Sequence, residues 1–238
     1  MISLRTSSEV NEMTEATPSG TARPITIEVW ADLGCPWCYI GKHRLQEAIA
    51  ARSDRDRFGL RLRSFELNPG APHTPETIES AFSRSHGGNA EVVLRAERQI
   101  QAVARSEGLP FSLDRLNANT FDFHRVVHHA DEQGLGLVFF TLVQDRFFAG
   151  DLNPFDVDAL AAAAAEVGLG ADRVREVLAG DEYADAVRAD IAEGRSLGVQ
   201  GVPFTVFDRR LAASGAQSVA GYAQALDAAV AETPAGVA

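Results

Sequence analysis

Apolar positions predict short strands near both ends of the chain and helices between them. Residues 25–33 alternate weakly and are rich in β-forming side chains, which suits a buried strand. Residues 36–51 place apolar side chains at helical spacing. Residues 60–67 alternate and predict a second strand, which the Asn-Pro-Gly segment at 68–70 ends. The first quarter of the chain therefore predicts the order β-α-β.

From residue 75 to about residue 198, the apolar spacing is helical. The predicted helices cover residues 76–86, 89–107, 119–133, 137–149, 155–167, 171–179 and 182–197. Six glycines that follow these helices stand where a left-handed cap residue belongs. These glycines are Gly108, Gly134, Gly150, Gly168, Gly180 and Gly198.

Strand signals return after this helical block. Residues 204–207 and 211–214 predict a hairpin, and residues 218–232 predict a terminal helix. Each β-containing end is too small to bury a core alone, so both ends are expected to share one sheet. The predicted fold is α/β, with a large all-helical domain inserted into a small sheet domain.

The expected division of the chain follows from these patterns. Residues 24–74 and 199–234 form the discontinuous sheet domain, and residues 75–198 form the inserted helical domain. Residues 1–23 are rich in Ser, Thr, Glu and Pro and predict a disordered leader.

Composition narrows the classes of partner. The 238 residues are 45% hydrophobic, and the net charge is −11 with a pI near 5.0. An acidic surface argues against nucleic acid and anionic membranes as partners. Apolar runs are too short to span a membrane, and the first two dozen residues contain no secretory apolar segment. We expect a cytoplasmic protein, either a monomer or a homodimer.

The candidate chemistry lies in Cys35-Pro36-Trp37-Cys38, at the junction of the first strand and first helix. These are the only two cysteines in the chain. Unpaired amides and the helix dipole favour a thiolate at Cys35. Pro36 suits the first helical turn. Cys38 lies one turn later and can close a disulfide with Cys35. We expect Cys35 to be an exposed nucleophile and Cys38 a more buried resolving thiol.

This cysteine pair has two other interpretations: it could be half of a zinc site, or two unreactive thiols in the core. A structural zinc site needs four ligands, and the chain has no second cysteine pair. In a cytoplasmic protein, such a pair at a strand–helix turn indicates redox chemistry. We therefore expect no metal.

Several segments together resemble the FrnE-like branch of the DsbA family. They are Cys-Pro-Trp-Cys-Tyr-Ile-Gly-Lys at 35–42, Phe-Glu-Leu-Asn-Pro at 65–69, Asn119-Thr120 with His124-Arg125, Gly-Val-Gln-Gly-Val-Pro at 198–203, and Ser-Gly-Ala-Gln at 214–217. The resemblance spans about residues 25–230. It implies a thioredoxin fold interrupted by a helical domain, and thiol–disulfide oxidoreductase activity without a built-in organic cofactor. The implied substrate is a disulfide-containing peptide or protein, or a small thiol, with glutathione as a candidate redox partner.

The same resemblance implies roles for individual residues. Cys35 matches the family's nucleophile and Cys38 its resolving cysteine, and the dipeptide Pro36-Trp37 between them matches the segment that tunes the redox potential. Pro203 matches the family's cis-proline facing the cysteine pair.

Val202, just before that proline, is expected to offer its backbone to an extended substrate segment.

Two other functions share features of this sequence. One is a glutathione-dependent isomerase or transferase of the 2-hydroxychromene-2-carboxylate isomerase or kappa-class type, although those enzymes usually have serine in place of Cys35. The other is a non-enzymatic, redox-sensing peptide-binding or chaperone module. An isomerase pocket could be lined by phenylalanines of the inserted block, but their spacing favours ordinary core packing. They are Phe139, Phe140, Phe147 and Phe148.

Asp32 and two histidines are further candidates. Asp32 precedes Cys35 by three residues and could relay a proton or cap the turn. His124 and His128 share one face of a predicted helix and could hold a metal, but hydrogen bonding or packing is the more common role.

Four other polar residues complete the candidates. Glu28 lies within the first strand, so it needs a partner if buried and could accept a proton near Cys38. Gln217 is expected to shape the rim of the site. Lys42 and Arg44 are most simply solvated helix charges, although either could favour a thiolate.

Overall fold

The computed structural model describes residues 23–85 and 90–232. The predicted leader therefore lies outside the described residues except for Arg23. The strands are β1 (Ile25–Ala31), β2 (Phe58–Ser64), β3 (Glu76–Thr77), β4 (Leu116–Asn117), β5 (Phe204–Phe207) and β6 (Leu211–Ser214). The helices are α1 (Pro36–Ala50), α2 (Ile78–Ser85), α3 (Ala90–Ser106), α4 (Phe121–Asp131), α5 (Gly136–Ala149), α6 (Val157–Glu166), α7 (Ala171–Ala179), α8 (Ala184–Ser196) and α9 (Val219–Ala231), with a short 3₁₀ turn at Arg55–Arg57.

One four-stranded sheet joins the two ends of the chain, in the order β2-β1-β5-β6. The central strand β1 runs parallel to β2 and antiparallel to β5, so Val29 lies between Leu62 and Thr205. This confirms the predicted fold, in which both ends of the sequence build one sheet around a large insertion. The β2 strand begins two residues earlier than predicted and ends at Ser64 rather than at residue 67.

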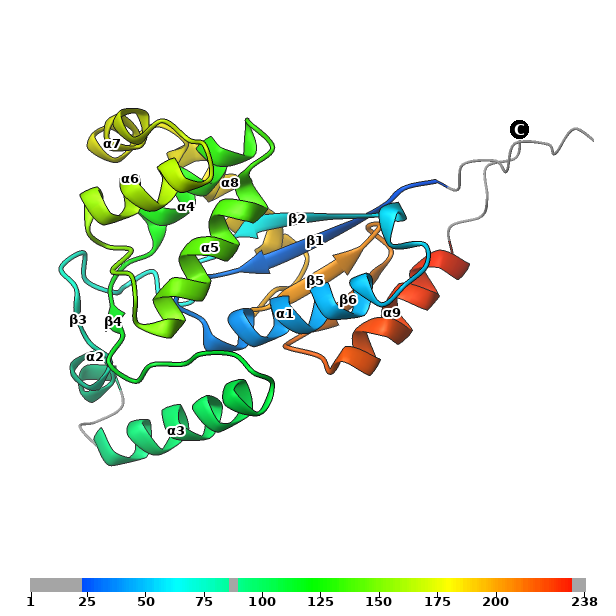
Figure 1. The fold of residues 1–238 in the computed structure, drawn as a ribbon, viewed down its shortest axis with the longest axis horizontal. Helices are drawn as coiled ribbons and strands as arrows, with labels where there is room; N and C mark the ends of the chain where they lie inside the picture. Colours follow the sequence, from blue (N-terminus) through cyan, green and yellow to red (C-terminus); the bar gives the residue numbers. More distant parts are fainter. Residues whose placement is uncertain (1–22, 86–89, 233–238) are drawn as a thin grey trace, which may run out of the picture.

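Helices α1 and α9 cover one face of the sheet, and α8 lies behind the opposite face (Figure 1). Side chains alternate along β1, so Trp30 points toward α8. The indole N–H of Trp30 donates to the Asp190 carbonyl at 2.9 Å. At Gly194 a Cβ atom would lie only 2.7 Å from the Trp30 ring. A glycine there lets α8 lie directly against the indole.

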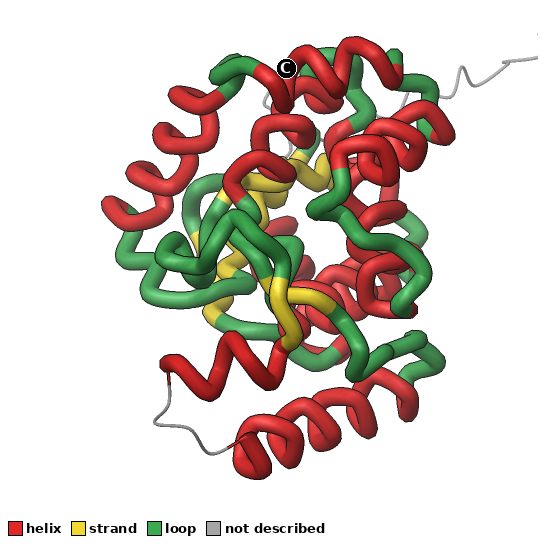
Figure 2. Tube along the Cα trace, turned by 90° about the vertical axis from the view of Figure 1, so that its left-hand side faces the viewer, coloured by secondary structure: helices red, strands yellow, loops and turns green. Residues whose placement is uncertain are grey.

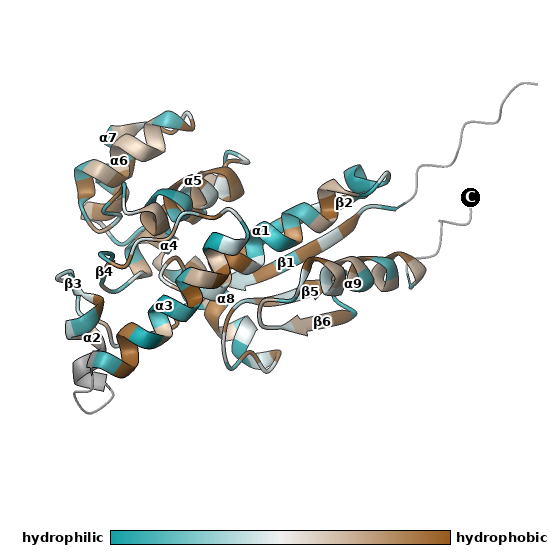
Figure 3. Cartoon of the chain, turned by 60° about the horizontal axis from the view of Figure 1, so that its bottom comes forward, coloured by the Kyte–Doolittle hydropathy of each residue, from teal (hydrophilic) through white to brown (hydrophobic). Residues whose placement is uncertain are grey.

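In the described part of the insertion, the regular elements are helices and one short strand pair. Strands β3 and β4 pair as Glu76↔Asn117 and Thr77↔Leu116, beside α2 (Figures 1 and 2). The prediction missed this pair because two-residue strands are too short to show alternation. The helix predicted to begin at residue 76 therefore begins at Ile78. Apolar residues recur along the otherwise hydrophilic α3 (Figure 3).

One hydrophobic core runs through the sheet and the insertion. Tyr39 of α1 stacks on Phe148 of α5, with ring centroids 4.5 Å apart. Because the core is shared, the domain boundaries at residues 75 and 198 stay a prediction. Most of the predicted helix-ending glycines have the expected positive φ, but Gly180 has a φ of −106° and ends α7 in extended backbone.

Candidate active site

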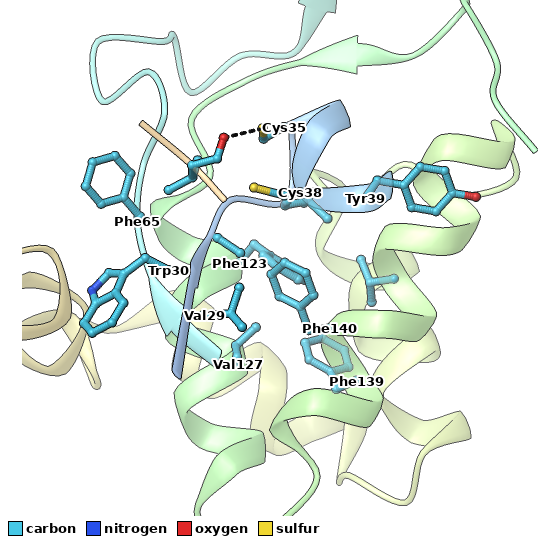
Figure 4. Close-up of a cluster of buried hydrophobic side chains, with 14 of the residues drawn as sticks. Val29, Trp30, Cys35, Cys38, Tyr39, Phe65, Phe123, Val127, Phe139 and Phe140 are labelled. Atoms are coloured by element: carbon cyan, nitrogen blue, oxygen red, sulfur yellow. Dashed lines mark hydrogen bonds between the residues drawn. The ribbon is translucent and has the colours of Figure 1, made fainter. Parts of the chain in front are cut away.

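Both cysteines lie at the start of α1. Cys35 is the residue before the helix, with extended φ and ψ of −82° and 114°, and Pro36 is the first helical residue as predicted. The backbone N–H of Cys38 donates to the Cys35 carbonyl at 3.1 Å. Both cysteines are free thiols, and their sulfur atoms lie on the same side of the helix start (Figure 4). The one-turn spacing therefore brings the two sulfurs together.

The predicted contrast in cysteine exposure is wrong. Cys35 is 3% exposed and Cys38 is 2% exposed, whereas Trp37 between them is 40% exposed. The reason is a contact that the sequence does not reveal. The Cys35 thiol donates to the Val202 carbonyl at 3.4 Å, so the loop before β5 lies over the first sulfur (Figure 4).

Burial governs the chemistry of the Cys38 thiol. It is the largest cause that raises the pKa of the Cys38 thiol well above its ordinary value. The Cys35 sulfur adds to this rise through a hydrogen bond and through its charge. Cys38 is thus held protonated beside its partner, which suits a thiol that acts only after another group has taken its proton.

The loop over Cys35 contains the predicted cis-proline. The Val202-Pro203 peptide bond is cis, and the Pro203 carbonyl accepts a hydrogen bond from the Gly215 amide at 2.8 Å. Helix α1 approaches this loop at Gly41, where a Cβ atom would lie 3.2 Å from Pro203 Cγ. The missing side chain at Gly41 lets the helix carrying the cysteines pack directly against the loop.

Asp32 lies buried behind the cysteine pair. Its carboxylate does not cap α1, contrary to one expectation, because Oδ2 accepts the Leu67 amide at 2.6 Å. Its carbonyl accepts the Cys35 amide at 3.3 Å. Its Oδ1 lies 3.4 Å from Nε2 of His124, a residue on α4. The structure thus brings Asp32 and His124 together, although no local pattern in the sequence pairs them.

His124 and His128 have separate partners. Nε2 of His128 lies 3.1 Å from the Ser64 hydroxyl and 3.2 Å from Asp190. Within residues 23–85 and 90–232, no group of three or more His, Cys, Asp or Glu side chains could hold a metal ion. The two histidines therefore serve different neighbours.

Glu28 is buried, and its carboxylate forms ion pairs with two arginines. Arg63 Nε donates to it at 2.8 Å, and Arg209 binds it from the β5–β6 turn. Burial alone would raise the pKa of Glu28, but the hydrogen bonds from Arg209 and Arg63 outweigh it and lower that pKa. Glu28 is thus a structural ion-pair partner, whereas the carboxylate that influences Cys38 belongs to Asp32.

Lys42 is not a solvated helix charge. It is 5% exposed, and its Nζ donates to Asp145 Oδ1 at 2.7 Å. Burial lowers the Lys42 pKa, and Asp145 on α5 opposes that shift. Arg44 is also paired, since its Nε binds Glu107 at 3.0 Å and its Nη1 donates to the Gln217 carbonyl at 3.2 Å. The prediction that both cations are solvated is wrong, because the residues that pair with them lie far away in the sequence.

Gln217 closes its own turn, with Nε2 donating to the Ser214 carbonyl at 2.7 Å.

The four phenylalanines of α5 are each at most 3% exposed, which confirms core packing over a pocket beside the thiols. Sequence reasoning missed Gln144, whose fully buried amide donates to the Asp32 carbonyl at 3.2 Å. No local pattern marks it, because its partner is 112 residues away.

Comparisons with known proteins agree with this geometry. A family model described as a DSBA-like thioredoxin domain matches residues 26–227. A probable DsbA oxidoreductase from Streptomyces coelicolor is 38% identical, with a TM-score of 0.83 over 90% of this chain and 94% of that chain. Two more distant structures share the fold. The cytosolic disulfide reductase DsbM from Pseudomonas aeruginosa, solved with GSH, is 19% identical with a TM-score of 0.56, over 87% of this chain and 96% of that chain. A 2-hydroxychromene-2-carboxylate isomerase is 13% identical with a TM-score of 0.62, over 87% of this chain and 95% of that chain.

Proposed function

Since the chain belongs to the DSBA-like thioredoxin domain family, we propose that it is a thiol–disulfide oxidoreductase acting through Cys35 and Cys38. One observation carries the proposal. The two free thiols lie at the start of one helix, and the Cys35 sulfur contacts the Val202 carbonyl beside cis-Pro203. A helix start supplies amides that stabilise a thiolate, and the proline loop supplies backbone groups with which a substrate can pair.

The reaction proceeds by two exchanges. The Cys35 thiolate attacks one sulfur of a substrate disulfide, and the other substrate sulfur leaves with the bonding electrons. Cys38 then attacks the Cys35 sulfur, releases the second substrate sulfur and closes the Cys35–Cys38 disulfide. The protein is oxidised by two electrons and the substrate is reduced, and the reverse sequence oxidises a substrate dithiol.

The proposed substrate is a disulfide-containing peptide or protein. Glutathione is the proposed small redox partner, on the analogy of the fold shared with a cytosolic reductase solved with GSH. The same analogy supports a cytoplasmic setting. The FrnE-like subtype is also part of the proposal, and it rests on the resemblance of the sequence alone. In the described residues, no helix has both the length and the apolar character needed to cross a membrane.

The other two functions have less support. A glutathione-dependent isomerase would need an apolar pocket beside the thiols, but the phenylalanines of α5 pack in the core. A redox-sensing chaperone would suppress aggregation equally well without its thiols. Measuring aggregation suppression by a variant lacking both cysteines separates that function from ours.

Reduction of insulin disulfides tests the main proposal. Cys35→Ser should abolish turnover, because the one remaining thiol, Cys38, is buried and its pKa is raised well above its ordinary value. Cys38→Ser should still attack but should accumulate a mixed disulfide, visible by mass spectrometry. Each variant is the matched control for the other, since both replace one buried thiol by a hydroxyl. Full turnover by Cys35→Ser would refute the assignment of the nucleophile.

A further inference from the structure

The tight turn that leads into α1 is held by a side chain from the helical insertion. The Cys35 amide closes this turn by donating to the Asp32 carbonyl at 3.3 Å. Leu33 and Gly34 are the two residues at its centre. Gln144 of α5 donates its amide to the Asp32 carbonyl at 3.2 Å and to the Leu33 carbonyl at 3.4 Å. It therefore fixes two consecutive peptide groups just before the first cysteine.

The backbone of Asp32 contacts both cysteines. Its carbonyl accepts the Cys35 amide, and its backbone hydrogen bond with the Cys38 sulfur opposes the rise in the pKa of that thiol. The position of the Asp32 backbone therefore affects how the two sulfurs lie relative to each other. Among the described residues, Gln144 is the side chain that donates to the carbonyl groups of this turn.

Gly34, the residue next to Cys35, is loosely packed. It is exposed, and a Cβ atom at this position would have nothing within 4 Å. The helix that follows begins without a side-chain cap. Glycine has the greatest backbone freedom of any residue, so this part of the turn has the most conformations to lose when it is fixed. The bond from Gln144 to the Leu33 carbonyl restrains the peptide group that Leu33 shares with Gly34.

Helix α5 is fixed against α1 on both sides of this contact. The residue after Gln144 is Asp145, whose Oδ1 accepts the buried Lys42 ammonium at 2.7 Å. One turn after Gln144, Phe148 stacks on Tyr39 with ring centroids 4.5 Å apart. These two contacts hold the Gln144 side chain at a set position beside the turn, so the insertion and the start of α1 form one packed unit.

Only the donor half of the Gln144 amide is used. The side chain is fully buried, and its Oε1 has no hydrogen-bond partner among the described residues. A buried polar atom without a partner lowers stability, so an apolar side chain of the same length would serve the core better. The amide is therefore explained by the turn that it holds and not by the packing of α5.

We propose that Gln144 is a positioning residue that favours the Cys35–Cys38 disulfide over the two free thiols. The proposal rests on the proposed oxidoreductase function and deepens it, because the helical insertion then sets the redox equilibrium of the cysteine pair. The hydrogen bonds of Gln144 go to the turn, so it acts on the sulfurs through the backbone.

The physical reason is the conformational entropy of the turn. In the disulfide form, a covalent bond ties Cys35 to α1 and restrains the turn with or without Gln144. In the dithiol form that bond is missing, so the hydrogen bonds from Gln144 remove more conformations. Restricting the dithiol form raises the effective concentration of one thiol at the other, which favours closure of the disulfide.

Exchange with glutathione measures this preference. The Cys35 thiolate attacks glutathione disulfide and releases one glutathione, and Cys38 then attacks the Cys35 sulfur and releases the second. The protein loses two electrons, and its two thiol protons pass to the two glutathione thiolates. The protein is equilibrated in buffers with graded ratios of glutathione to glutathione disulfide. Alkylation of the free thiols and mass spectrometry then give the fraction of the disulfide form and the equilibrium constant.

Two variants should move the equilibrium constant in opposite directions. Gln144→Met keeps the length of the side chain and removes the two donated bonds, so we expect the constant to fall roughly 3- to 10-fold. Gly34→Ala should raise it, because alanine restricts the turn, and Gly34 has neither a positive φ nor a close neighbour that would oppose a Cβ atom. Added to Gln144→Met, Gly34→Ala should restore part of the loss.

Thr141→Val is the matched control. Thr141 lies one turn before Gln144 on α5, and its buried hydroxyl has no hydrogen-bond partner among the described residues. Valine has nearly the same shape, so the substitution removes a buried polar group without touching the turn. It should leave the equilibrium constant unchanged.

Urea denaturation of both redox forms separates positioning from a general loss of stability. In a closed thermodynamic cycle, Gln144→Met must destabilise the disulfide form more than the dithiol form, by about 1.4 kcal/mol for a tenfold fall in the constant. Equal losses in the two forms with an unchanged constant would show a purely structural role and overturn the proposal. An equal fall in Thr141→Val would also overturn it. If the unaltered protein formed no Cys35–Cys38 disulfide in any of the buffers, the proposed function itself would be wrong.

Discussion

The contact between α8 and the central strand gives a sharp test of how the insertion is fixed to the sheet. Gly194 lies on α8 against Trp30, which is fully buried. The substitution Gly194→Ala would place a Cβ atom 2.7 Å from both Cδ1 and Nε1 of that indole. The indole N–H is already committed to the Asp190 carbonyl, so the ring cannot turn away without losing that bond.

The size of the effect follows from three terms. Carbon atoms pack at about 3.5–4.0 Å, so the ring or the helix must move by about 1 Å. Overpacking of this kind costs about 1–3 kcal/mol, and weakening the indole hydrogen bond costs about 1 kcal/mol. Alanine regains about 1 kcal/mol over glycine within a helix. We expect the free energy of unfolding to fall by about 1–3 kcal/mol.

Urea denaturation followed by circular dichroism and tryptophan fluorescence measures this change. Gly59→Ala on β2 is the matched control, since a Cβ atom there would have nothing within 4 Å. It should change the free energy of unfolding by less than about 0.5 kcal/mol. Trp30→Phe, combined with Gly194→Ala, should show a favourable coupling because the smaller ring makes room. A Gly194→Ala protein as stable as the unaltered one would refute the reasoning.

Three further predictions concern charge and the rim of the site. Asp145→Asn should destabilise the fold by about 2 kcal/mol in urea denaturation, whereas Lys42→Met should cost less than about 1 kcal/mol, because only the former leaves a buried charge unpaired; equal costs would contradict this. Glu28→Gln should destabilise the protein by about 1–2 kcal/mol at neutral pH. Since the folded-state pKa of Glu28 is lowered, that difference should shrink below about pH 4, and a constant difference in denaturation series across pH would be inconsistent with it. Trp37→Ala should raise KM for a peptide disulfide severalfold but leave KM for a small aromatic disulfide and the unfolding midpoint nearly unchanged, because this exposed ring is free to pack on an extended substrate; equal changes in both KM values would argue against that contact.

The sequence predicted the elements that leave a periodic pattern. The strand at residues 25–33, the helix after it and the terminal hairpin were all recovered, because each alternates or repeats over four or more residues. Their assembly into one sheet followed from the small size of each end. The pair β3 and β4 left no such pattern, since each strand contributes two residues.

The sequence predicts which residues carry the sulfur chemistry of the site. It does not predict which residues surround them. Cys35 and Cys38 are marked by their spacing, and Pro203 by the family resemblance. The approach of His124 to Asp32 joins segments 92 residues apart, and Lys42 finds Asp145 103 residues away. Such contacts are set by how α4 and α5 pack on α1 and the sheet, which local spacing does not encode. The low exposure of Cys35 has the same origin, because it depends on Val202.

The contact between Cys35 and Val202 also bears on how the protein is made. The two residues are 167 positions apart, with the thiol near the beginning of the chain and the carbonyl near its end. At a translation rate of about 5–20 residues per second, the thiols are synthesised about 8 to 33 s before that carbonyl. During this interval the reactive sulfurs exist on the ribosome without the backbone that later covers them. Every newly made copy thus passes through a stage in which its cysteines are open to cellular oxidants and its central strand lacks one neighbour.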